Sequence, residues 1–260
     1  MKLGIPDMLD FFECVSRLHV ARFQRPLWQG YHADPSPLNA LIVFLEGYAF
    51  ERRGSNPSYA HAAVDMLMSL PFKPDPAELW EMFKSCLGSG KLNEKVNPLY
   101  HTDSEECNCL LCRVKEQDII RQTEVLIREN RVREAWEKLT SIRGIGAKIA
   151  SLFLRDLAVW FDLTPNTVDR WYMQPVDVWV RRTVKLLSGS NMSDEEIAKW
   201  IVRNSENPER ANQGIWYFAS QVSGSEFRLR RCVQDRDYRE MLYKQHIASL
   251  RDAVFAIPSL

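Results

Sequence analysis

Residues 139–150 read LTSIRGIGAKIA, and the fold expected for the chain depends on this stretch. Gly144 and Gly146 permit a tight turn between two helices, because glycine adopts backbone conformations that other residues avoid. Ile142 and Ile145 are expected to hold the turn in a hydrophobic core. The segment therefore predicts a helical hairpin whose exposed backbone N–H groups bind a phosphate at the positive end of the second helix.

The sequence around the hairpin is also helical in pattern. Residues 37–53 form an apolar segment that ends in charge and is long enough for a largely buried helix. Apolar residues recur at helical spacing after Lys148, and the chain contains no convincing alternating strand pattern. Pro175 suits the first turn of a further helix. We therefore expect an all-α protein without repeats or low-complexity segments.

Composition limits the classes of protein to consider. The 260 residues are 45% hydrophobic, which excludes a mostly disordered chain. The 34 basic and 34 acidic residues cancel, so any DNA-binding surface must be local and small. No apolar run is long enough to cross a bilayer, and residues 1–13 lack a signal-peptide pattern, so a soluble cytoplasmic protein without a membrane partner is expected.

A second motif follows the hairpin along the chain. Residues 139–150 resemble the helix-hairpin-helix element, usually written LPGVGxKTA, with Arg143 where proline is common. Residues 175–182, PVDVWVRR, resemble the PVDTHVxR signature, with Trp179 in place of histidine. Together they resemble the superfamily of DNA glycosylases named for the helix-hairpin-helix and its Gly-Pro-Asp loop. The strong resemblance covers residues 139–182, and a weaker one extends over residues 37–54.

The resemblance implies two catalytic residues. Asp177 occupies the position of the catalytic aspartate, whose carboxylate stabilises positive charge on the sugar as the glycosidic bond breaks. Lys148 occupies the position of the nucleophile that forms a Schiff base in bifunctional members. Partial burial and the positive helix end are expected to disfavour the ammonium form of Lys148, which lowers its pKa and makes the neutral amine available as a nucleophile. Asp177 could instead be an ordinary helix-start aspartate, and Lys148 a plain phosphate contact.

The resemblance also assigns DNA contacts. Residues expected at the DNA backbone are Arg143, Gly144, Gly146 and Arg181. A wedge that fills the stack vacated by a flipped base is expected at Tyr48 and Phe50. A pocket for that base is expected at Gln213, Trp216 and Tyr217. For these aromatic residues, core packing is the competing interpretation.

The cysteines suggest a separate feature. Cys107, Cys109 and Cys112 form a CxCxxC pattern that could hold a structural zinc ion, with His101 as fourth ligand. Three reduced thiols are the alternative. Only Cys232 follows Asp177, so no iron–sulfur cluster of the endonuclease III type is expected.

The combined expectation is a DNA glycosylase built from two helical subdomains with an active-site cleft between them. Residues 37–148 would form a helical barrel ending in the hairpin, and residues 1–36 with 149–260 the subdomain carrying Asp177. A monomer would excise a damaged or modified base from double-stranded DNA without a cofactor, with β-lyase activity. It would be cytoplasmic, and nucleoid-associated in a bacterium or archaeon. The alternatives are a monofunctional glycosylase, an enzyme for hypermodified bases of foreign DNA, and a non-catalytic DNA-binding module.

Overall fold

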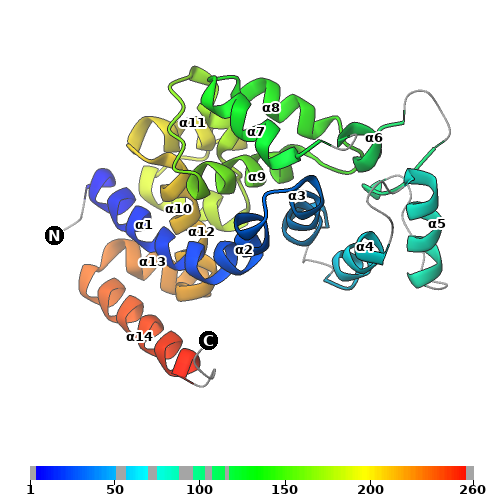
Figure 1. Cartoon of the computed structure of the whole chain (residues 1–260). Coiled ribbons are helices and arrows are strands. Elements are labelled where there is room, and N and C mark those ends of the chain that lie inside the picture. Colours follow the sequence, from blue (N-terminus) through cyan, green and yellow to red (C-terminus); the bar gives the residue numbers. More distant parts are fainter. Residues whose placement is uncertain are drawn as a thin grey trace. The chain divides into compact units, whose positions relative to one another are not determined.

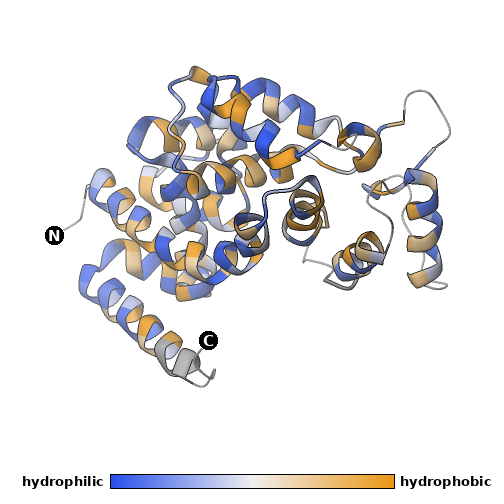
Figure 2. Ribbon diagram, in the orientation of Figure 1, coloured by the Kyte–Doolittle hydropathy of each residue, from blue (hydrophilic) through white to orange (hydrophobic). Residues whose placement is uncertain are grey.

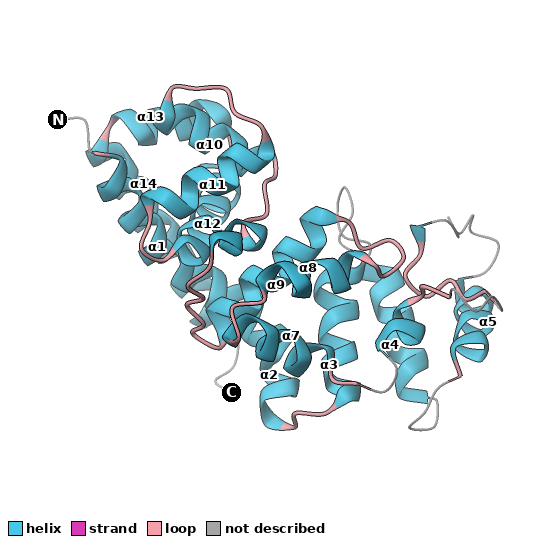
Figure 3. Cartoon of the chain, turned by 90° about the horizontal axis from the view of Figure 1, so that it is seen from above, coloured by secondary structure: helices cyan, strands magenta, loops and turns pink. Residues whose placement is uncertain are grey.

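The computed structural model describes residues 4–50, 57–69, 75–87, 96–102, 107–114 and 117–255. Every regular element in these ranges is a helix, and none is a strand (Figure 1, Figure 3). The expected all-α fold is therefore confirmed. Among the helices of these ranges, none is both long and apolar enough to span a membrane.

The chain divides into two compact units. The terminal unit comprises Met1–Ala21 and Val176–Leu260, and the central unit comprises Arg22–Pro175. Each has its own hydrophobic core. The helices carry hydrophobic residues toward these cores and hydrophilic residues elsewhere (Figure 2).

The terminal unit is assembled around the packing of its first helix against a late one. Its helices are α1 (Ile5–His19), α10 (Val178–Ser188), α11 (Asp194–Asn204), α12 (Pro208–Tyr217), α13 (Glu226–Gln234) and α14 (Arg236–Phe255). A Cβ atom at Gly214 of α12 would lie 1.7 Å from the backbone oxygen of Phe12 in α1. The two helices therefore approach so closely that only glycine fits at this position.

The central unit surrounds a largely buried helix, α9. Its helices are α2 (Arg25–Ala33), α3 (Pro37–Phe44), α4 (Pro57–Ser69), α5 (Pro76–Leu87), α6 (Leu110–Val114), α7 (Ile119–Arg128), α8 (Val132–Thr140) and α9 (Ala147–Trp160). Phe153 of α9 stacks on Trp28 of α2, with ring centroids 6.2 Å apart, and meets Phe44 of α3 edge-on at 5.0 Å.

The observed division differs from the expected boundaries at residues 37 and 148. Both α2 and α9 belong to the central unit, because the aromatic contacts of Trp28 and Phe153 place them in one core. The terminal unit consequently begins again only at Val176, directly before Asp177. The hairpin therefore lies inside the central unit instead of at its end.

The close approach of α1 and α12 generates a prediction about stability. Gly214→Ala should destabilise the chain by about 3 kcal/mol, because the added methyl group meets backbone that cannot move aside. Gly30→Ala in α2 is the control, since nothing lies within 4 Å of its Cβ position. Alanine there should stabilise the chain by up to about 1 kcal/mol. Urea unfolding compares the two, and equal effects would contradict this description of the α1–α12 packing.

Candidate functional site

The turn between α8 and α9 has the expected hairpin geometry. The N–H of Ile145 donates to the carbonyl of Ile142 at 3.0 Å, and both side chains are buried as expected. Gly144 occupies the third position of this turn with φ 76°. That left-handed conformation favours glycine. Gly144 is thus required by the backbone of the hairpin.

The first turn of α9 leaves donor groups open to solvent. Gly146 begins the helix without a side-chain cap, and nothing lies within 4 Å of its Cβ position. Gly146, Ala147 and Lys148 are all exposed. Within the described ranges, their backbone N–H groups have no acceptor. Unpaired N–H groups at the positive end of a long helix form a suitable site for a phosphate.

Lys148 projects from this same turn. Its side chain is exposed, so the expected partial burial is wrong: α9 buries its opposite face, starting with Ile149. Lys148 forms no ion pair within the described part of the chain, so its charge is free to meet an anion beside the open N–H groups.

Arg143 is held from two sides. Its backbone N–H donates to the carbonyl of Asn108 at 2.7 Å. Its guanidinium lies over the ring of Tyr100, 4.8 Å from the centroid. The half-buried side chain therefore belongs to the support of the turn, in addition to its expected role at the DNA backbone.

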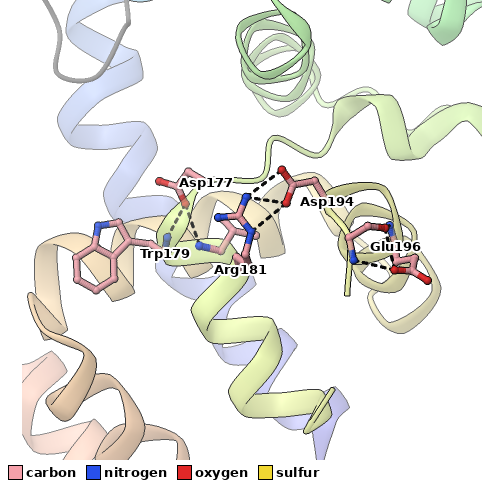
Figure 4. A network of polar contacts seen from close by, with 7 residues as sticks. Asp177, Trp179, Arg181, Asp194 and Glu196 are labelled. Carbon is pink, nitrogen blue, oxygen red and sulfur yellow. Dashed lines mark hydrogen bonds and ion pairs between the residues drawn. The ribbon is translucent and has the colours of Figure 1, made fainter. Parts of the chain in front are cut away.

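Asp177 begins α10 in the terminal unit. One carboxylate oxygen, Oδ1, accepts the N–H groups of Trp179 and Val180, both at 2.9 Å (Figure 4). The side chain is half-buried, and its other oxygen has no partner among the described residues. This is a helix cap, which fixes the carboxylate in one orientation and leaves one oxygen available for chemistry.

Arg181 lies one turn further along α10. Its guanidinium donates to Oδ1 of Asp194 from two of its nitrogens, Nη2 at 2.7 Å and Nε at 3.0 Å (Figure 4). Both side chains are about half exposed, so water screens the pair. In this structure Arg181 is paired within the protein, and a phosphate would have to compete with Asp194.

The residues expected in a base pocket lie in the core of the terminal unit. Gln213 and Tyr217 are fully buried. Gln213 accepts a hydrogen bond from Ser16 at 3.0 Å, and the Tyr217 hydroxyl lies 3.0 Å from Nε2 of His246. Trp216 is half-buried. The structure favours core packing for Gln213 and Tyr217, because α1 and α14 occupy their polar groups.

The residues expected to form a wedge are also buried. Tyr48 is 1% exposed; it accepts a hydrogen bond from Trp28 and donates one to Asp156. Burial raises the pKa of Tyr48 well above its ordinary value, which keeps it a neutral donor. Phe50 stacks on Phe83 in the same core. A wedge must reach the surface, so these positions do not fit that role.

The cysteine motif forms a compact cluster with His101. Nδ1 of His101 and the Sγ atoms of Cys107, Cys109 and Cys112 all lie within 4.8 Å of one another. The distances from Nδ1 are 3.3 Å to Cys107, 3.6 Å to Cys112 and 4.0 Å to Cys109. A tetrahedral zinc site with ligands at about 2.0–2.3 Å has edges of about 3.5–4 Å, so the Sγ atoms of Cys107 and Cys112, which lie 2.7 Å apart, would separate on binding an ion. The cluster could therefore hold a metal ion such as zinc, as the sequence indicates.

The thiols of the cluster differ in acidity. Burial raises the pKa of Cys109 and also that of Cys112. For Cys107, burial is outweighed by hydrogen bonds from Cys112 and the backbone of Thr102 and Cys109, which lower its pKa to about 6. The lowered pKa of Cys107 favours its thiolate form, and a bound ion would supply positive charge that favours the thiolate forms of Cys109 and Cys112.

The structure contains two features that were not predicted from the sequence. Arg155 and Asp156 form a buried ion pair in α9, with Nε and Oδ1 2.8 Å apart. Two charges inside the apolar run of residues 149–160 were the signal for it. The sequence gives no indication of the contact between Asn108 and the hairpin, because any residue type at position 108 would offer the same backbone carbonyl.

No model of a known protein family, no characterised protein and no solved structure shows significant similarity to this chain. Its function is therefore inferred from its residues and their geometry.

The two hairpin glycines should respond differently to alanine. Gly144→Ala should cost about 1–2 kcal/mol of stability, because φ 76° is strained for any residue with a Cβ. Gly146→Ala should cost less than about 1 kcal/mol, because its φ of −87° and open surroundings accept a methyl group. Thermal and urea unfolding measure both. If Gly146→Ala proves the more harmful change, the turn is not as described.

Proposed function

We propose that this chain is a DNA glycosylase that binds duplex DNA through its hairpin and excises a base. The observation that carries the proposal is the uncapped start of α9, where the N–H groups of Gly146, Ala147 and Lys148 stand open beside a free lysine ammonium. This arrangement suits a DNA phosphate. The net charge of zero makes such a local site necessary for binding.

The proposed chemistry gives Lys148 and Asp177 the separate roles that the resemblance to glycosylases implies. Lys148 gives up its ammonium proton to water, and the amine then attacks C1′ as the glycosidic bond breaks. The base departs with the electron pair of that bond and takes up the proton that the newly attached nitrogen loses. The free oxygen of Asp177 stabilises the positive charge that develops on the sugar. Opening of the sugar gives an imine at Lys148, from which β-elimination cleaves the strand. If water attacks C1′ in place of Lys148, the same site gives a monofunctional enzyme.

A second candidate is a DNA-binding module without catalysis. Two observations favour it: Asp177 caps α10, which is sufficient reason for an aspartate, and the exposed Lys148 suits a phosphate contact. We rank it second because the resemblance to glycosylases includes both residues in their catalytic positions, a combination that a binding module does not require.

We further propose that the metal of the cysteine cluster is a structural zinc ion. Three thiols and an imidazole suit zinc, and such four-ligand sites leave no position for a substrate. The N–H of Cys112 also donates to the sulfur of Cys109 at 3.4 Å, which helps to stabilise a thiolate there. Metal analysis of the chain purified without chelator tests this, with about one equivalent of zinc expected.

Asp177→Asn tests the catalytic proposal without disturbing the helix cap, because asparagine caps helices as well as aspartate does. On a duplex that the wild type excises, single-turnover excision should fall by about 10²- to 10³-fold while duplex affinity stays within twofold. The control is Asp235→Asn, which alters a second aspartate that accepts a backbone N–H at a helix start, that of Tyr238. Excision by Asp177→Asn within tenfold of wild type would remove Asp177 from the mechanism.

A further inference from the structure

The metal cluster and the hairpin turn are joined directly. Asn108 lies between Cys107 and Cys109 in the sequence, and its carbonyl accepts the N–H of Arg143 at 2.7 Å. Arg143 immediately precedes Gly144. One backbone hydrogen bond therefore connects the segment that carries two metal ligands to the turn that would bind phosphate.

A second connection runs through the other ligand segment. Tyr100 precedes His101, and its ring lies under the guanidinium of Arg143, 4.8 Å from the centroid. The ring is held by Trp80, which meets it edge-on at 5.1 Å. Both segments that supply metal ligands thus contact the same hairpin residue, one through the main chain of Arg143 and one through its side chain.

The ligand segments have little regular structure of their own to fix these contacts. The described residues 96–102 and 107–109 contain no α-helix, and α6 has only five residues. Leu110 donates to the carbonyl of Pro98 at 2.7 Å, which ties the two segments together beside the cluster. A bound ion would add four bonds at this point, and binding energy of that kind acts as folding energy for a short segment.

We propose that the metal centre holds the hairpin turn in its phosphate-binding conformation, by fixing Asn108 and Tyr100 against Arg143. The DNA part of this inference rests on the proposed function. Loss of the metal should free the Asn108 carbonyl, release the Arg143 N–H and loosen the turn that orders the open N–H groups of α9. Metal content would then set affinity for DNA without any metal–DNA contact.

The test compares the zinc-loaded chain, the same chain after chelation, and Cys112→Ser. Cys86→Ser is the matched control, because Cys86 is exposed and lies outside the cluster. Hydrogen–deuterium exchange of the Arg143 and Ile145 amides measures how well the hairpin turn is ordered in the absence of DNA. Exchange there should be about tenfold faster in both metal-free samples, as expected for the loss of one hydrogen bond, and zinc added back to the chelated chain should reverse it. Amides of α3 should keep their protection.

Fluorescence anisotropy then measures binding to a labelled duplex that contains one tetrahydrofuran abasic-site analogue. The metal-free samples should bind about tenfold more weakly, and Cys86→Ser should bind like the wild type. Unchanged exchange at Arg143 after metal loss would overturn the inference. An equal loss of protection in α3 would also overturn it, because the metal would then stabilise the whole central unit and not the hairpin in particular. Failure of the zinc-loaded chain to bind the duplex would contradict the proposed function instead, while the exchange data still decide whether the metal holds the hairpin.

Discussion

The left-handed backbone at Gly144 is the constraint on which the central unit depends. It lets the chain reverse between α8 and α9, with Ile142 and Ile145 buried below the turn. The reversal directs α9 through the core, where it packs against α2 and α3. The same turn leaves the start of α9 without a cap, so the feature that organises the core also creates the proposed phosphate site.

Several contacts that are individually weak meet at one residue of this turn, Arg143. The N–H of Arg143 donates to the carbonyl of Asn108, and its guanidinium lies over the ring of Tyr100. Asn108 and Tyr100 are each next to a residue of the cysteine–histidine cluster. A net charge of zero gives the protein little general attraction for DNA, so the proposed affinity would have to come from donors held in a defined position. A turn fixed by a bound metal ion would provide such donors, because the N–H groups of α9 would already be ordered before DNA binds.

Much of this could be predicted from the sequence, but the surroundings of single side chains could not. The all-α fold, the hairpin with its buried isoleucines and the grouping of His101 with three cysteines followed from periodicity, glycine placement and spacing. Tyr48 and Gln213 were expected at DNA and lie in cores, because aromatic and amide residues at helical spacing suit a core equally well. The domain boundaries depend on which of the two cores α9 packs into. That packing is decided by tertiary contacts, which the sequence of α9 alone does not reveal.

Borohydride trapping tests whether Lys148 is the nucleophile of a glycosylase, and it does so without knowledge of the target base. A duplex with a natural abasic site offers the aldehyde at C1′; the amine condenses with it, releasing water, and borohydride reduces the imine to a stable amine. We predict a covalent protein–DNA adduct with wild type and with Lys138→Gln, which removes another exposed lysine of the same unit, and none with Lys148→Gln. An adduct of equal yield in Lys148→Gln, or none in the wild type, would show that Lys148 is not the nucleophile.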